Sequence, residues 1–301
     1  MPLLNSRLGQ MLCLMLLAGC GPSEHRSYQP ELGAMPLQPL TEYVVGIHPL
    51  HNPQRLMELY GPIIDYLNSN IPDAHFKLEA SRNYEEFEKK LYAGRFSFAM
   101  PNPYQTIKSV EHGYLIFGKM GDDADFRGII LIRRDSGIKV VKDLKGRAIA
   151  YPAATALAAT LMPQYYLHTH GINVNRDVDN RYVGSQESSI MNVVRGDVAA
   201  AATWPLPWRT FSAEHPDLAM QLESKWETAS LPNNGWVVRA DISKVHADKF
   251  AAVLFSLNKT VEGRAILAKL PVSNFEAASN DTYRPVREFL DKFSISVRPI
   301  E

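Results

Sequence analysis

The stretch YPAATALAATLMP, residues Tyr151–Pro163, predicts a strand that turns directly into a helix. The strand is expected over Arg147–Ala150 and the helix from about Thr155 to His168. A helix start presents unpaired backbone N–H groups, so such a junction is a common place for a protein to hold an anion. The first turn is nearly all alanine here, and Thr155 is the one hydroxyl placed to face such a ligand.

The same order of strand and helix recurs along the chain. EYVVGIH (Glu42–His48) predicts a strand, and Asn52-Pro53 then supplies a helix cap with proline in the first turn. Further strands are expected at His75–Ala80, Phe96–Met100, Leu115–Gly118, Tyr182–Val183 and Asp197–Thr203. Repeated βαβ units predict parallel strands with right-handed crossovers, and ligands of such sheets bind at the carboxyl ends of the strands.

Length and composition fit two lobes. The chain has 301 residues, of which 46% are hydrophobic and 21% charged. RGIILIRRD (Arg127–Asp135) is apolar enough to cross between lobes, and GWVVRA (Gly235–Ala240) returns the chain. We expect an α/β fold of two lobes, each a mixed, mainly parallel sheet flanked by helices, with two crossing strands as the hinge. The predicted boundaries are 41–128 plus 237–301 for lobe 1 and 129–236 for lobe 2.

The first twenty residues predict export. The apolar stretch Met11–Leu17 has the length of a signal-peptide core and is too short to span a bilayer. Leu17-Ala18-Gly19-Cys20 then resembles the bacterial lipoprotein box, whose cysteine carries diacylglycerol. We expect a signal peptide over residues 1–19 and an acylated Cys20 with a flexible tether over residues 20–40, holding the protein at a bacterial membrane, facing the periplasm or the cell exterior. The alternative is a buried cysteine in an ordinary signal peptide.

Charge and motif content exclude several other functions. Lys plus Arg and Asp plus Glu both total 32, so the chain lacks the positive field of a nucleic-acid binder. His168 and His170 fall at a predicted helix end, and the acidic cluster at 122–125 lacks the pattern of a calcium loop. No serine-hydrolase elbow, zinc-protease helix or phosphate loop is present. We therefore expect no catalytic residue, no metal, no cofactor and a monomer.

Six segments, taken in order, resemble one family. They are GIHPLHNPQRLMELYGPIIDYL, YAGRFSFAMPNPY, DSGIKVVKDLKG, the strand-turn-helix ending in Pro163, VVRGDVAAA and LPNNGWVVR. Together they resemble the phosphonate and phosphite solute-binding proteins of bacterial ABC importers, over roughly residues 42–295. The resemblance implies a type II-like periplasmic-binding-protein fold that closes over a small oxyanion, delivers it to a permease and catalyses nothing.

The chain departs from that family at the expected ligand contacts. The Ser/Thr-rich turn falls on Ala154–Ala159, the family's histidine falls on Gln186, and its acidic position falls at or near Trp204. Asn234 stands where an aspartate is frequent. An ammonium would find no carboxylate partner, which argues against an aminoalkylphosphonate. The candidate ligand-binding residues, each of which could instead be a turn or core residue without ligand contact, are His48, Asn102, Tyr104, Thr155, Ser185, Gln186, Trp204, Asn233 and Asn234.

The sequence thus predicts a lipid-anchored solute-binding protein that captures a phosphonate-like, phosphite-like or phosphate-like oxyanion, or a related small molecule, for ABC import. Two alternatives stay open at this point. One is a ligand-sensing lipoprotein that partners a membrane sensor kinase. The other is an enzyme on the same fold, which would need a catalytic cysteine or histidine in the cleft; Cys20, the one cysteine expected in the mature chain, is committed to the lipid.

Overall fold

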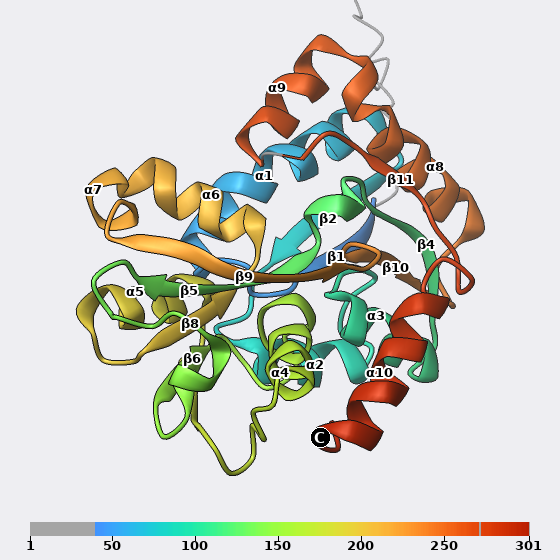
Figure 1. Ribbon diagram of the computed structural model, residues 1–301. Coiled ribbons are helices and arrows are strands. Elements are labelled where there is room, and N and C mark those ends of the chain that lie inside the picture. Colours follow the sequence, from blue (N-terminus) through green and yellow to red (C-terminus); the bar gives the residue numbers. More distant parts are fainter. Residues whose placement is uncertain (1–39, 271, 301) are drawn as a thin grey trace, which may run out of the picture. The chain divides into compact units, whose positions relative to one another are not determined.

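The computed structural model describes residues 40–270 and 272–300, so the predicted signal peptide, Cys20 and the predicted tether before Leu40 lie outside the described residues. Residues 40–300 build two sheets with helices packed around them (Figure 1). The predicted α/β fold of the periplasmic-binding-protein type, with two mixed sheets flanked by helices, is confirmed.

One sheet has six strands, and it takes its strands from both ends of the chain. Its order is β11-β4-β10-β3-β1-β2. Strands β1, β2 and β3 run parallel, whereas β10 pairs antiparallel with β3 and β4, and β11 pairs antiparallel with β4. The bounds are β1 (Thr41–Ile47), β2 (Ala74–Glu79), β3 (Phe98–Met100), β4 (Tyr114–Met120), β10 (Gly235–Arg239) and β11 (Phe275–Ala277).

The second sheet has five strands, in the order β7-β6-β8-β5-β9, all from the middle of the chain. Strand β6 runs parallel to β7 and β8, and β5 runs antiparallel to β8 and β9. The bounds are β5 (Arg127–Arg133), β6 (Ala148–Tyr151), β7 (Asp179–Tyr182), β8 (Ala200–Thr203) and β9 (Leu222–Ser230).

Helices cover both sheets and begin where the sequence places capping residues. Asn52 caps the first of them, accepting from Arg55 N at 3.0 Å with Pro53 in the first turn. The α-helices are α1 (Pro53–Asn70), α2 (Tyr84–Tyr92), α3 (Pro103–Glu111), α4 (Met162–Thr169), α5 (Gln186–Arg195), α6 (Pro205–Glu214), α7 (Pro216–Ala219), α8 (Lys244–Ser256), α9 (Val261–Lys269) and α10 (Arg284–Ser296). Four shorter turns are η1 (Asp123–Asp125), η2 (Val141–Leu144), η3 (Leu157–Leu161) and η4 (Leu257–Lys259), of which η3 is π-helical and the others 3₁₀.

Alternation along β5 shows how the five-stranded sheet is buried on both faces. Ile129 and Leu131 join the cluster that packs against α5 and α6, including Ile190 and Phe211. Residues one position along β5 point to the opposite face, where Ile130 lies in the larger cluster with the η3 residues. This double burial explains why RGIILIRRD reads as a nearly continuous apolar run.

The chain passes between the two sheets twice, through residues 121–126 after β4 and residues 231–234 before β10. Strands β5 and β10 each belong to one sheet, so the passages lie immediately before these two strands. Asp123 joins the passages, since its Oδ1 accepts from Asn233 N at 3.0 Å and from Lys119 Nζ at 2.8 Å. Asn233 also donates through Nδ2 to Gly121 O at 2.8 Å.

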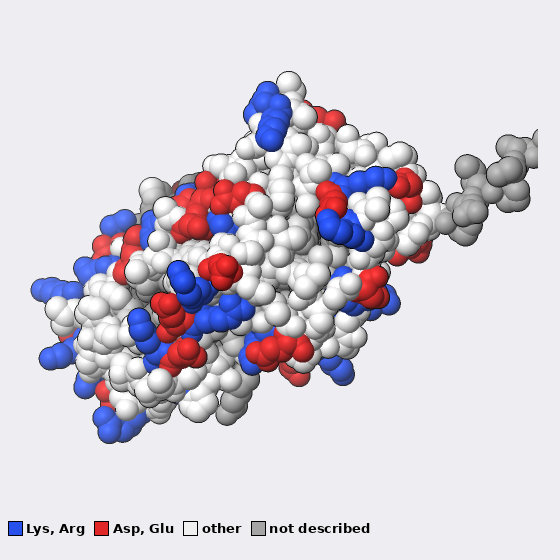
Figure 2. All heavy atoms as spheres, turned by 90° about the vertical axis from the view of Figure 1, so that its right-hand side faces the viewer, with Lys and Arg blue, Asp and Glu red and all other residues white. Residues whose placement is uncertain are grey.

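The surface carries balanced charge. On the face shown in Figure 2, Lys and Arg side chains lie next to Asp and Glu side chains, in agreement with ion pairs such as Arg209 with Asp125 and Arg133 with Asp135. Among the described residues, no helix combines the length and apolar character needed to cross a bilayer.

Candidate ligand-binding site

An enclosed cavity lies where strands from both sheets end and several helices begin. Strand β1 ends next to His48, β3 leads to the α3 cap Asn102, and β8 leads to Trp204 before α6. This is the carboxyl edge at which open α/β sheets bind ligands. The residues that line the cavity are all buried: His48, Tyr84, Asn102, Phe126, Ala156, Leu157, Ala158, Ala159, Gln186, Trp204 and Asn234.

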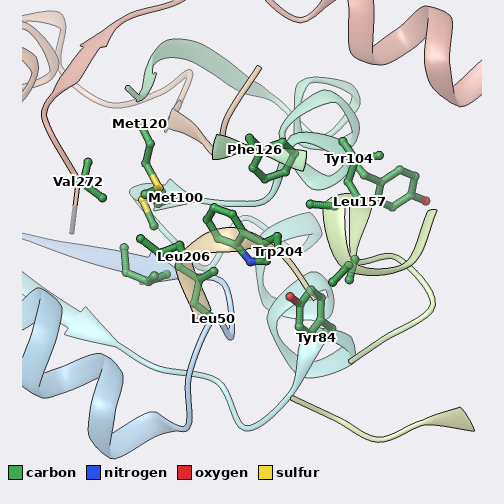
Figure 3. Close-up of a cluster of buried hydrophobic side chains, with 14 of the residues drawn as sticks. Leu50, Tyr84, Met100, Tyr104, Met120, Phe126, Leu157, Trp204, Leu206 and Val272 are labelled. Atoms are coloured by element: carbon green, nitrogen blue, oxygen red, sulfur yellow. The ribbon is translucent and has the colours of Figure 1, made fainter. Parts of the chain in front are cut away.

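Apolar and aromatic side chains form much of the wall. Trp204 lies in the middle of the cluster in Figure 3, with Phe126 and Leu157 beside it, and the Phe126 and Trp204 ring centroids are 5.3 Å apart. The cavity measures about 10 Å³, which is close to the least that holds one water molecule. A ligand of several heavy atoms therefore needs the lobes to separate further than they do in this structure.

The alanine-rich turn lines the cavity, and its first amides are not hydrogen-bonded. Helix η3 continues into α4, and the amides of Thr160 and Leu161 both donate to Ala156 O. Within the ranges that the structure describes, the amides of Leu157, Ala158 and Ala159 make no hydrogen bond. Consecutive N–H groups without partners at a helix start favour a negative or strongly polar group.

His48 is held as a neutral imidazole. Its Nδ1 lies 3.0 Å from Met100 O, and its ring meets the Tyr84 ring edge-on at 6.0 Å between centroids. Burial, opposed only in part by the Met100 carbonyl, lowers the pKa of His48 to about 4. The imidazole is therefore uncharged at neutral pH.

Gln186 and Tyr84 form a polar patch on one wall. Gln186 Oε1 accepts from Thr203 Oγ1 at 2.8 Å, which directs Nε2 toward the Tyr84 hydroxyl 3.5 Å away. Burial raises the pKa of Tyr84, so its hydroxyl stays protonated. Both groups can donate to a ligand.

Asn102 and Asn234 also line the cavity, but they differ in their remaining hydrogen-bond capacity. Asn102 Oδ1 caps α3 by accepting from Gln105 N at 3.0 Å, and its Nδ2 donates to Thr155 O at 3.2 Å. Asn234 is fully buried, and its Oδ1 has no partner in the described part of the chain. A buried, unpaired carbonyl oxygen facing a cavity is a feature expected of a ligand contact.

Four of the nine predicted residues lie outside the cavity wall. Ser185 caps α5 by accepting from Ser188 N at 3.1 Å, and Asn233 joins the two passages. Tyr104 lines a groove between α3 and α10, and Figure 3 shows its ring pointing away from Trp204. Thr155 Oγ1 donates to the Glu88 carboxylate at 2.5 Å. In this structure the Ser185 side chain is therefore a helix cap, Asn233 links the two passages, Thr155 makes an inter-lobe hydrogen bond, and Tyr104 lines a different groove.

Sequence reasoning missed two lining residues, Tyr84 and Phe126. Tyr84 is the first residue of α2, and Phe126 lies in the first passage between the sheets. Neither position carries a local signal, because each reaches the cavity only when the two sheets are brought together.

The wall carries no formal charge. None of its residues is Lys, Arg, Asp or Glu. Among residues 40–270 and 272–300, no group of three or more His, Cys, Asp or Glu side chains could hold a metal ion. Of the residues weighed above as possible metal ligands, His170 stacks on the Tyr166 ring, and a carboxylate oxygen of Asp122 accepts a hydrogen bond from Ser273 N.

A two-sheet α/β fold with a site at the carboxyl ends of the strands is the architecture of solute-binding proteins. The sequence matches the family described as "ABC transporter, phosphonate, periplasmic substrate-binding protein" over residues 45–283, and the chain belongs to that family. The family consists of binding proteins of ABC transporters and not of enzymes.

Individual relatives are distant. The chain is 23% identical over 171 residues to the tetrathionate sensor histidine kinase TtrS of Salmonella typhimurium, covering 54% of this chain and 28% of the kinase. It is 21% identical over 164 residues to the phosphonates-binding periplasmic protein of Escherichia coli, covering 53% of this chain and 48% of that protein. The matches thus span less than half the length of either curated relative.

Solved structures share the fold. A binding protein component of an ABC phosphonate transporter from Pseudomonas aeruginosa has a TM-score of 0.77 at 18% identity, over 85% of this chain and 88% of that one. PhnD1 from Prochlorococcus marinus, in complex with methylphosphonate, has a TM-score of 0.77 at 17% identity, over 84% and 98% of the two chains.

Proposed function

We propose that this protein is a lipid-anchored, extracytoplasmic receptor that captures a small oxyanion between its lobes and delivers it to an ABC permease. Membership of the phosphonate-binding family supports the transport role. The observation that carries the ligand class is the run of amides at Leu157–Ala159, which belong to residues that line the cavity and make no hydrogen bond within the described residues.

The neutral wall restricts the ligand further. An aminoalkylphosphonate carries an ammonium group, and the cavity wall offers it no carboxylate. We infer a ligand without a cationic group, held by backbone amides, by Gln186 and Tyr84, and by the apolar walls around Trp204.

Capture requires the lobes to move. We propose that the lobes meet at the passages 121–126 and 231–234, close to the predicted boundaries of 41–128 plus 237–301 and 129–236, and that bending occurs there, so that β5 and β10 stay with their sheets. A ligand that contacts both lobes shifts the equilibrium toward the closed form by its differential affinity for that form.

Calorimetry on the purified protein tests this function. Titrations with methylphosphonate, phosphite, phosphate and arsenate should find at least one ligand, and small-angle scattering should show a smaller radius of gyration in its presence. Absence of binding by all four, together with an unchanged radius, would contradict the proposal.

Lipid anchoring has its own test. Metabolic labelling with a fatty-acid probe should tag the wild type and Cys13→Ser, whereas Cys20→Ser should remain untagged. Cys13 is the matched control, because it lies in the segment that we expect to be removed with the signal peptide. Equal labelling of Cys20→Ser would exclude Cys20 as the anchor.

A sensory role is the second candidate, and the similarity to a sensor histidine kinase favours it. In this case the closed form would dock onto a membrane kinase. Ligand-dependent crosslinking in cells to a kinase, with none to a permease, would select the sensor over the transport receptor.

A further inference from the structure

Two hydrogen-bond acceptors of fixed orientation face the cavity from the lobe of the six-stranded sheet. The first is His48. Its Nδ1 lies 3.0 Å from Met100 O, and because a carbonyl oxygen only accepts, Nδ1 carries the ring hydrogen. The neutral ring then presents Nε2 as a lone-pair acceptor.

The surroundings of His48 keep it in that form. Across from it lie the Tyr84 and Phe87 rings of α2, and His51 lies on the same loop. The carboxylate of Glu88, also on α2, accepts hydrogen bonds from Thr155 and Gln105. With burial lowering the pKa of His48 to about 4, the ring stays an acceptor at neutral pH.

The second acceptor is Asn234, which is 0% exposed. Its Nδ2 lies 3.3 Å from Met120 Sδ, and a thioether sulfur only accepts, so the amide nitrogen belongs on that side. Oδ1 is therefore the end left without a partner in the described ranges, on a residue that lines the cavity.

The other lobe presents donors. The Leu157, Ala158 and Ala159 amides belong to the cavity lining and make no hydrogen bond in the described ranges, and Gln186 Nε2 points toward the Tyr84 hydroxyl of the cavity wall because Thr203 occupies Oε1. A ligand that bridges the lobes thus meets donors on one side and acceptors on the other. A fully deprotonated oxyanion can satisfy the donors but repels the lone pairs of His48 and Asn234.

We propose that the cavity selects a singly protonated oxyanion, an acid whose bare oxygens accept from Leu157–Ala159 and whose remaining hydroxyl donates to His48 Nε2 or Asn234 Oδ1. The class comprises monoanionic phosphonates and phosphite, each with one acidic proton left, and the hydrogen dianions of phosphate and arsenate. Sulfonates and sulfate, which carry no proton at neutral pH, are rejected. This inference rests on the proposed function and deepens it.

The test is calorimetry with acid pairs of matched shape, methylphosphonate against methanesulfonate and phosphate against sulfate. The phosphorus acid of at least one pair should bind at least tenfold more tightly than its sulfur partner. The affinity for methylphosphonate should fall about tenfold per pH unit above its second pKa, because its last proton is lost there, whereas phosphate keeps one proton above its second pKa and should not lose affinity. Above the second pKa of methylphosphonate, its binding enthalpy should also vary with the ionisation enthalpy of the buffer, since a proton is taken up.

Variants separate acceptors from donors. Asn234→Leu and His48→Phe each remove one acceptor, and the variant that lacks the acceptor of the ligand hydroxyl should reduce the selectivity for the phosphorus acid at least tenfold; unchanged selectivity in both would contradict the proposal. Gln186→Leu removes a donor and should weaken both acids of a pair alike. Thermal melts establish which variants fold, and where only one acceptor variant folds, the pH dependence of the affinity tests the proposal.

The outcomes are distinct. A sulfur acid that binds as tightly as its phosphorus partner, or an affinity for methylphosphonate that rises through its second pKa, would overturn the selection of a protonated acid and leave the solute-binding function standing. Binding of none of the acids would overturn both.

Discussion

Thr155 Oγ1 lies 2.5 Å from Glu88 Oε1, and this hydrogen bond joins the turn before η3 to helix α2 of the other lobe. Gln105 Nε2 donates to the same carboxylate oxygen at 2.9 Å, and Asn102 Nδ2 donates to Thr155 O. The sequence predicts the Thr155 hydroxyl as a ligand contact, whereas in this structure it forms a hydrogen bond between the two lobes.

Thr155→Val should strengthen ligand binding by up to about tenfold, because it removes a hydrogen bond to a charged group that holds the lobes in a form without room for a ligand. Calorimetry measures the affinity, and small-angle scattering should show a larger radius for the unliganded variant. Thr160→Val is the matched control, since its hydroxyl donates to Ala153 O within the same lobe. Glu88→Ala should reproduce the gain; a loss of affinity confined to Thr155→Val would instead identify Thr155 as a direct ligand contact.

The buried His48 should make the protein less stable in mild acid. Its pKa is about 4 in the folded protein and about 6.5 when unfolded, so the unfolded chain takes up a proton first as the pH falls. Stability is fully present above about pH 6.5 and declines toward about pH 4, by up to about 3 kcal/mol.

Urea unfolding at pH 7 and pH 4.5 measures this loss. His48→Gln cannot take up the proton and should lose less stability between the two pH values than the wild type does. His170→Gln, at an exposed histidine, should follow the wild type. If His48→Gln also follows the wild type, His48 does not carry the acid sensitivity.

Lys119→Met should destabilise the fold by about 1–3 kcal/mol. The Lys119 ammonium is buried, and it donates to Asp123 at 2.8 Å, to Glu276, and to Met120 O at 3.3 Å. Lys244→Met removes an exposed pair with Asp248 and should change stability by less than about 0.5 kcal/mol. Chemical denaturation compares the unfolding free energies of the two variants. Equal losses would show that burial does not strengthen the interactions of Lys119.

Gly128→Ala should displace η3, which lines the ligand site, because Gly128 lies on β5 directly against η3. A Cβ at Gly128 would lie 2.5 Å from Ala158 O and 2.8 Å from Pro163, so η3 or β5 must move. We expect weaker ligand binding and a loss of about 1–3 kcal/mol of stability. Gly61→Ala in α1 meets no atom within 4 Å and should stabilise the protein by up to about 1 kcal/mol, without changing affinity. Unchanged affinity in Gly128→Ala would show that the position of η3 does not matter for binding.

The elements could be predicted because their signals are local. Asn52-Pro53 caps α1 as expected, and the strand predicted over Glu42–His48 is β1, Thr41–Ile47. The helix predicted from Thr155 begins two residues later and opens with a π-helical turn, where Ala156 O accepts from both Thr160 and Leu161. The spacing of alanines does not distinguish that turn from an ordinary α-helical one.

The candidate site could be predicted only in part. His48, Asn102, Gln186, Trp204 and Asn234 follow or precede strands at the edge where ligands bind, and all five line the cavity. Thr155 and Ser185 lie at the same edge, but their hydroxyls hydrogen-bond to Glu88 and to the Ser188 amide. Strand ends indicate which residues come near the cavity, whereas the choice of partner depends on what the other lobe presents.

By itself the sequence determined the alternation of strands and helices, the separation into two sheets and the neutral character of the site, because periodicity, capping and residue type are local properties of the chain. The tertiary structure alone decided that the alanine turn presents backbone amides, that Thr155 meets a carboxylate 67 positions away, and that His48 Nε2 and Asn234 Oδ1 remain as acceptors. Burial and hydrogen-bond pairing are properties of residues that are distant along the chain, and they are fixed only when the two lobes pack together.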